Sequence, residues 1–276
     1  MAKSRVMWCG ALAALALVCA SSFALAEESP PRRPFETLSP WTLERGQWEG
    51  AAGVLYRKDA AAPFFSDRRR ARRDEWRLSL VDVALGLGSS GEARLQFGLQ
   101  RFAEQGGLEE SGIQDVRLSF TYRLPPRRID TALQLEVKLP NASGERRLGT
   151  DETDLFLMGG AGHRAGRWGW AADLGLGILG SPSDAGVQDD VVVGGVSAWF
   201  TPSLAGPGSR WTLLGEVHAM AASRFGNDFR YARAGVRVGR RFPVDLSVRR
   251  GLTAASETWG AEAGITIRRP GRSRIP

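Results

Sequence analysis

The stretch that decides the fold is GIQDVRLSFTYRL, PPRRID and TALQLEVKLP, which together form residues 112–140. In its two limbs, 112–124 and 131–140, apolar side chains alternate with polar ones. Alternation with a period of two residues indicates a β-strand with one apolar and one polar face. The Pro-rich turn between the limbs predicts an antiparallel hairpin. Nearly every polar position carries a charge, so the fold depends on where that charged face points.

The same pattern recurs along the rest of the chain, and no amphipathic helix of convincing length competes with it. Residues 76–88 switch their apolar phase halfway, which predicts a β-bulge. The Gly- and Val-rich segment 189–201 has no clear polar face. The predicted strands are 47–56, 76–88, 91–103, 113–124, 130–140, 153–163, 167–179, 189–201, 210–222, 229–241, 243–250 and 257–268.

Connections between these strands alternate between long and short, except that 202–209 is long for its class. Outer-membrane barrels combine short periplasmic turns, longer outside loops and an even number of strands of about 9–11 residues. We therefore expect residues 47–268 to form an all-β, antiparallel up-and-down transmembrane β-barrel of about 12 strands. Both ends of the barrel segment would then face the periplasm.

The first 26 residues have the features of a secretory signal peptide. Lys3 and Arg5 precede an apolar run over 6–18, and Ala24-Leu25-Ala26 supplies the cleavage site. The two cysteines lie inside this segment, so the exported chain would be free of cysteine. Residues 27–46, rich in Pro and charge, are predicted to be an extended periplasmic lead-in, and 269–276 a basic C-terminal tail. The formal net charge of +7 favours an anionic membrane surface over nucleic acid for an exported protein.

The apolar face carries aromatic residues near strand ends, among them Trp76, Trp168 and Trp259. Aromatic girdles are expected where a barrel wall meets the two membrane interfaces, whereas a soluble β-sandwich, the alternative, has shorter strands. The polar face would then line a lumen. Its charges could form a cross-strand salt-bridge ladder or, as a second interpretation, select anions. The candidate lumen-lining residues are Arg94, Arg117, Glu136, Lys138, Glu216, His218, Arg233, Arg237, Asp245, Arg249 and Glu262.

Three short motifs resemble the meta-pathway phenol degradation family of outer-membrane barrel proteins. They are Gly112-Ile113-Gln114-Asp115 at a strand start, Lys138-Leu139-Pro140 at a strand end, and the loop 148–154 (LGTDETD). The chain departs from the family at Asn141-Ala142-Ser143, where Thr-Gly is usual, and in its basic tail. The resemblance covers roughly residues 90–200. It implies an outer-membrane channel, with aromatic or other small organic acids as candidate solutes.

Catalytic chemistry has little support in the sequence. The two histidines, His163 and His218, fall on different strands, and no cluster provides the three or four ligands of a zinc site. A hydrolase built on His218, Glu216 and Ser197 is an alternative, but no nucleophile motif accompanies it. We predict no enzyme activity, no metal, no cofactor and no catalytic residue.

Two functions remain open at this point: passive uptake of small molecules through the barrel, or a non-transporting structural barrel whose lumen is plugged. The expected partners are outer-membrane lipid and lipopolysaccharide, a small-molecule solute and the barrel-assembly machinery, with no nucleic acid. The arginine-rich loop 59–74 could contact lipopolysaccharide or capture anionic solutes. The sequence leaves the oligomeric state open.

Overall fold

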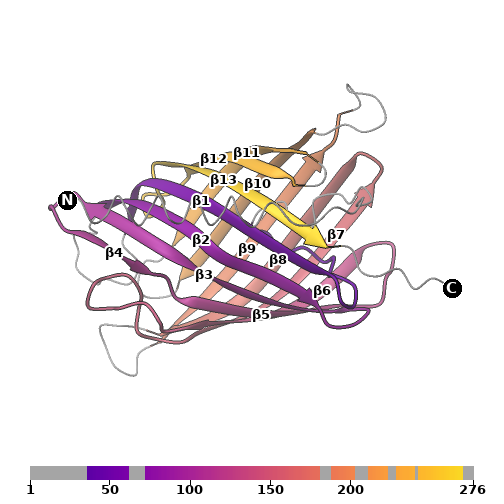
Figure 1. The fold of residues 1–276 in the computed structure, drawn as a ribbon, viewed down its shortest axis with the longest axis horizontal. Helices are drawn as coiled ribbons and strands as arrows, with labels where there is room; N and C mark the ends of the chain where they lie inside the picture. The colour runs from indigo at the N-terminus through magenta and orange to yellow at the C-terminus, as the bar shows by residue number, and fades with distance from the viewer. Residues whose placement is uncertain are drawn as a thin grey trace.

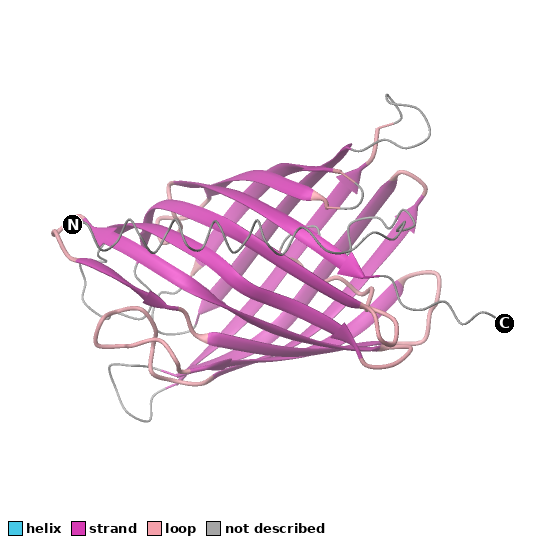
Figure 2. Ribbon diagram, in the orientation of Figure 1, coloured by secondary structure: helices cyan, strands magenta, loops and turns pink. Residues whose placement is uncertain are grey.

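The computed structural model describes residues 36–61, 72–180, 188–202, 211–222, 228–239 and 242–269. Regular structure in these ranges consists of β-strands joined by loops (Figure 2). No helix in them is long and apolar enough to cross a membrane. The strands are β1 (Trp48–Ala61), β2 (Arg72–Gly86), β3 (Gly91–Glu104), β4 (Glu109–Ile113), β5 (Val116–Arg123), β6 (Asp130–Leu139), β7 (Asp154–Ala165), β8 (Trp168–Gly180), β9 (Gln188–Phe200), β10 (Trp211–Ala222), β11 (Phe229–Val238), β12 (Val244–Gly251) and β13 (Trp259–Arg269).

The strands form one closed antiparallel sheet (Figure 1). Most strands pair with their sequence neighbours, and β1 closes the barrel by pairing with β13. β4 and β5 pair with the two halves of β3, so they act as one interrupted strand and the wall is twelve strands around. Closure removes the exposed sheet edges that an open sheet would leave. The predicted fold class, an antiparallel barrel of about 12 strands, is confirmed.

The interruption between β4 and β5 differs from the single strand predicted over 113–124. The backbone N–H of Gln114 donates to the Gly98 carbonyl. The next side chain, Asp115, accepts hydrogen bonds from the backbone of Asn141 (3.0 Å) and Ala142 (2.9 Å). Asp115 thus holds the start of the loop between β6 and β7, and the strand breaks where the loop is attached.

β2 contains the bulge that the phase switch predicted. Ser79 lies opposite Gly98 and Val81 opposite Phe97, so Leu80 has no partner residue on β3. A Cβ atom on Gly98 would lie 2.1 Å from the Leu78 carbonyl oxygen, so only glycine allows this close approach of the two backbones.

The first long loop is shorter than the predicted 57–75, because β1 continues to Ala61 and β2 begins at Arg72. Cross-strand contacts explain the extension: the Arg57 guanidinium binds Glu75 at 2.6 Å, and the Tyr56 hydroxyl donates to Asp74 at 3.2 Å. Arg68, Arg69 and Arg70 lie outside the described residues, as do the predicted signal peptide 1–26 and residues 270–276 of the predicted tail.

The outer surface of the wall is apolar along mid-strand. Leu174 and Leu176 on β8 are 67% and 66% exposed, and Val248 on β12 is 62% exposed. Exposed aromatic residues stand at both ends: Tyr122, Trp168 and Trp211 near the short turns, and Trp76 and Trp259 near the long loops. A water-soluble protein would bury such a surface, whereas a lipid-facing barrel wall requires it.

Residues 36–46 lie inside the barrel instead of extending from it as a periplasmic lead-in. Leu38, Trp41 and Leu43 are buried. Their neighbours are inward-facing side chains of the wall, and the segment leaves the barrel at the short-turn end, where Gly46 bonds to Gly86. The buried apolar side chains and the polar partners described below explain this placement. Residues 27–35 lie outside the described residues.

Candidate functional site

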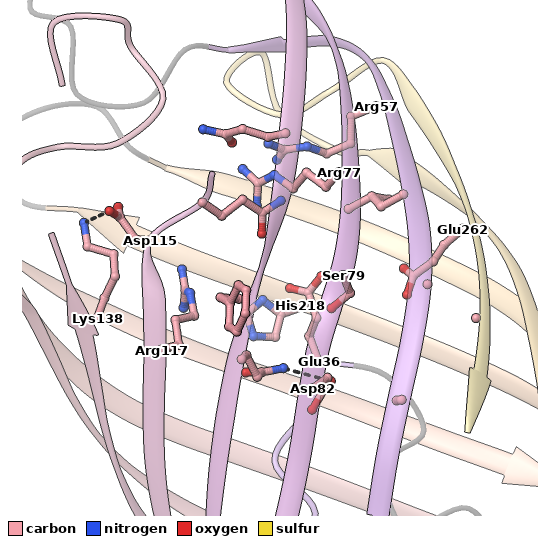
Figure 3. A pocket seen from close by; sticks show the side chains of 18 of the residues that line it. Glu36, Arg57, Arg77, Ser79, Asp82, Asp115, Arg117, Lys138, His218 and Glu262 are labelled. Carbon is pink, nitrogen blue, oxygen red and sulfur yellow. Dashed lines mark hydrogen bonds and ion pairs between the residues drawn. The ribbon is translucent and has the colours of Figure 1, made fainter. Parts of the chain in front are cut away.

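The barrel encloses an elongated cavity of about 690 Å³. Its lining runs from Arg57, Arg73 and Glu257 near the long loops to Glu49 and Arg268 near the short turns. Inward-facing side chains of β1, β2, β5 and β6 converge on it (Figure 3). Because its lining extends from the long-loop end of the barrel to the short-turn end, the cavity is the candidate functional site.

Ten of the eleven candidate residues named from the sequence line this cavity. The eleventh, Glu216, is only 4% exposed and lies behind the N-terminal segment. Alternation therefore placed these side chains on one surface. Those that line the cavity are Arg94, Arg117, Glu136, Lys138, His218, Arg233, Arg237, Asp245, Arg249 and Glu262.

Most of the lumenal cations are paired with acids on adjacent strands. Arg117 on β5 binds Glu136 on β6 at 2.6 Å. Arg237 on β11 makes a two-point contact with Asp245 on β12, at 2.6 and 2.7 Å. Arg94 likewise pairs with Asp82. Such pairs compensate charges that are withdrawn from bulk water, which is the salt-bridge ladder considered above.

The wall formed by β11 and β12 is less positive than its two strands suggest. Arg233 pairs with Glu262 on β13, and Arg249 pairs with Glu257 in the loop between β12 and β13. Arg249 also binds the Glu36 carboxylate at 3.1 Å. These acids come from outside the two strands, so the residues of β11 and β12 alone do not show these pairings.

Glu36 lies inside the barrel yet keeps 45% of its side-chain surface open to the lumen. Enclosure by protein opposes its charge, but the guanidinium groups of Arg249 and Arg233 and the ring of His218 outweigh that effect. They hold the pKa of the Glu36 carboxyl well below its usual range. Glu36 is therefore an anion at neutral pH.

A cationic cluster lies at the long-loop end of the cavity. Arg57, Arg73 and Arg77 all contact the single carboxylate of Glu75, which is fully buried. Three guanidinium groups on one acid leave two positive charges in excess. The sequence alone did not predict this cluster, because Arg57, Arg73 and Glu75 fall in the predicted connection between the strands 47–56 and 76–88.

Lys138, at the end of β6, has two acidic partners. Its Nζ atom lies 2.7 Å from Asp154 and 3.5 Å from Asp115 (Figure 3). It also bonds to the Thr150 hydroxyl at 2.5 Å. Lys138 thus fixes the loop between β6 and β7 and carries no surplus charge into the lumen.

One side of the lumen is apolar. Phe156, Met158, Leu179 and Val193 point inward from β7, β8 and β9, and Leu38 packs on them. The segment 189–201 gave no clear polar face because β9 is apolar on both faces, one toward lipid and one toward this patch. A cavity with an apolar wall beside charged walls suits solutes that are partly apolar and partly ionic.

Acidic side chains of the wall hold the N-terminal segment by its backbone. Thr37 donates its N–H and its hydroxyl to Glu216, both at 2.8 Å. The Leu38 N–H donates to Asp173, and the Leu43 N–H donates to Glu92 at 2.9 Å. These hydrogen bonds satisfy backbone donors that would otherwise be buried without partners.

Trp41 fixes the same segment by its side chain. Its indole N–H donates to Asp130 at 2.8 Å, and its ring meets Trp199 edge-on at 5.5 Å between centroids. The Arg164 guanidinium lies over the Trp41 ring, 3.8 Å from its centroid. Tryptophan contacts of this kind combine large burial with a polar anchor.

The hydrolase alternative lacks its central contact. The Ser197 hydroxyl donates to the Ala171 carbonyl at 3.5 Å, and Ser197 is 1% exposed. No hydrogen bond joins Ser197 to His218 in the part of the chain that the structure describes. His218 instead stacks on Tyr231, with 5.6 Å between ring centroids. Within the same residues, no group of three or more His, Cys, Asp or Glu side chains could hold a metal ion.

No protein-family model and no curated protein sequence matches the chain. Among solved structures, the fold is similar to that of the COG4313 outer membrane channel from Pseudomonas putida F1. The TM-score is 0.60 at 13% identity, covering 90% of this chain and 100% of the other. The NanC porin is similar with a TM-score of 0.50 at 8% identity, covering 80% of this chain and 98% of the other. At these identities the similarity establishes the fold, which is that of an outer-membrane barrel.

Proposed function

We propose that the chain is an outer-membrane channel for passive uptake of small molecules. The observation that carries this proposal is the cavity of about 690 Å³, which reaches from side chains near the long loops to side chains near the short turns. A lipid-compatible outer wall and the shared fold with an outer membrane channel add support. The strands would then cross the membrane with the short turns in the periplasm, and the barrel-assembly machinery would insert them.

The solutes we propose are small aromatic or other organic acids. Phe156 and Met158 offer an apolar contact surface, and the Arg57, Arg73 and Arg77 cluster holds excess positive charge at the long-loop entrance. An acid with an apolar body would be attracted by the cluster and pass along the apolar wall. The resemblance to the meta-pathway phenol degradation family agrees with this class of solute. The ion-paired lumen residues, such as Arg117 and Arg237, would shape the passage more than select charge.

A non-transporting barrel is the second candidate, and a specific observation favours it. Residues 36–46 occupy part of the lumen and are anchored to the wall at Glu216, Asp173 and Glu92. If this segment filled the passage at its narrowest point, the barrel would serve as a structural or surface element only.

Planar-bilayer recording distinguishes the two candidates. We expect the folded full-length protein to give discrete conductance steps, and a salt gradient to give a reversal potential of anion-preferring sign. Replacing Arg57 and Arg77 together by glutamine removes the excess charge and should shift that potential toward cations. The matched control is Arg127→Gln with Arg128→Gln, which changes the same charge in the exposed turn between β5 and β6. Folded protein without conductance steps would favour the non-transporting barrel.

A further inference from the structure

The outer wall carries an apolar groove of about 600 Å³ across β1, β11, β12 and β13, next to β2. Its floor consists of small side chains of β13, Ala261 and Ala263, and Ala234 lies on the far side of Val248. Larger apolar side chains border it. They are Val54, Tyr56 and Trp76 on one side and Val236, Leu246 and Val248 on the other. The groove is thus a depression in a surface that is otherwise covered by protruding leucine and valine.

An aromatic cluster borders the groove toward the long loops. The Tyr56 ring lies 4.7 Å from the Trp76 ring and 5.2 Å from the Trp259 ring, measured between centroids. Aromatic residues of this kind mark the depth at which lipid headgroups begin. The groove therefore begins at the interface and extends toward the hydrocarbon core.

Two cations stand on either side of Trp259. The strand register places Lys58 opposite Trp259, and Trp259 opposite Arg250. Lys58 lies two residues after Tyr56, and Arg250 lies two residues after Val248. Because Tyr56 and Val248 line the groove, both cations point to the same outer face. Neighbouring strands are about 4.8 Å apart, so the Lys58 and Arg250 backbones are separated by roughly 10 Å. Their long side chains can reach a common anionic group.

Arg230 adds a third cation one step further toward the rim, where the Leu252 N–H bonds to its carbonyl. Lys58, Arg230 and Arg250 are exposed, and within the described residues no ion pair engages any of their side chains. They differ in this from lumenal arginines such as Arg117 and Arg237, which are paired.

The acids nearby already have donors of their own. Asp74 accepts from the Tyr56 hydroxyl and from the Asp59 backbone N–H, at 3.2 and 3.1 Å. The Asp59 side chain accepts from Thr258 at 3.1 Å. Asp228, the other acid on this face, lies beyond Arg230 at the rim. The three cations are therefore available to a ligand outside the chain.

We propose that the groove and the cations Lys58, Arg230 and Arg250 form a binding site for lipopolysaccharide, the phosphorylated and acylated glycolipid of the outer leaflet. One acyl chain would lie along the alanine floor, and the glucosamine phosphates would bind the cations above it. Charge complementarity at headgroup depth favours this lipid over an uncharged one. The proposal rests on the placement in the outer membrane proposed above, but not on transport.

Native mass spectrometry of the folded full-length protein in detergent tests the site. The probe is a deep-rough lipopolysaccharide, compared with the same lipid after its phosphates are removed. We expect retention of the phosphorylated lipid by the wild type, with weak retention of the dephosphorylated form. Lys58→Gln with Arg250→Gln should weaken retention roughly 30-fold, as expected for two surface cations. Arg127→Gln with Arg128→Gln, at the opposite end of the barrel, should leave it unchanged.

Ala261→Trp, which fills the groove, should also weaken retention although every cation remains. Equal retention of both lipids by the wild type would overturn the proposal and mean that only annular lipid is bound. So would equal loss in the two double variants. Heat-modifiable mobility on gels checks that each variant is folded. Because binding is measured without conductance, a barrel that does not conduct but retains phosphorylated lipid refutes transport and leaves the site in place.

Discussion

The lipid-facing assignment of the wall makes a quantitative prediction for Leu174→Arg. Leu174 is the seventh of thirteen residues in β8 and is 67% exposed on the outer surface. Six residues at about 3.3 Å each, in a strand tilted by about 40°, place it roughly 15 Å from either strand end along the membrane normal. That is the middle of the hydrocarbon band, where arginine costs about 2–4 kcal/mol.

The matched variant is Leu213→Arg on β10. Leu213 is also outward-facing, 51% exposed, and only two residues from the start of its strand. By the same geometry it lies about 5 Å from the strand end, near the interface, where arginine costs about 0–1 kcal/mol. Reversible denaturant unfolding in phospholipid vesicles, followed by tryptophan fluorescence, measures both. Equal costs, or a larger cost for Leu213→Arg, would show that the wall is not oriented in a bilayer as argued.

Three further predictions concern the lumen and the bulge. Glu216→Gln removes the charge of the group that accepts the two Thr37 hydrogen bonds. A hydrogen bond to a charged group contributes about 1.5–3 kcal/mol, so a cysteine placed at buried Ser39 should react with a thiol label about tenfold faster or more. Asp245→Asn, which leaves the segment untouched, should not raise this labelling rate. Because the pKa of Glu36 is lower in the docked segment than its ordinary value, the contribution of Glu36 to docking should be complete at neutral pH and be lost as the pH falls through and below the ordinary carboxyl range. The labelling rate of the same cysteine, divided at each pH by the rate of a free thiol, should therefore rise less on acidification in Glu36→Gln than in the parent. Gly98→Ala should cost about 1–3 kcal/mol of unfolding free energy, since its Cβ meets the Leu78 carbonyl; Gly215→Ala, with open space around its Cβ, is the control, and a similar cost for both would contradict this reading.

Alternation along the strands was enough to predict β-structure, because residues such as Leu133 and Gln134 differ in polarity at every step. The number and length of the strands and the alternation of long and short connections then indicated a barrel. It also placed ten of eleven candidate side chains on the lumen surface. It could not predict which acid meets which cation, since Arg249 finds Glu36 and Glu257 through the tertiary fold. Nor could it place residues 36–46, several of whose hydrogen bonds come from backbone N–H groups that every sequence carries.

Anchoring by the backbone has a consequence for how the lumen is specified. Glu216, Asp173 and Glu92 accept N–H groups of Thr37, Leu38 and Leu43, so part of the information for docking lies in the wall. A short charged side chain buried in the wall needs a partner, and an incoming backbone provides one without a second charge. Where the wall instead faces the open cavity, as at Arg117 and Arg237, the same need is met by an acid on the next strand. The two kinds of pairing thus divide the lumen into a part that binds the segment and a part that stays open to solutes.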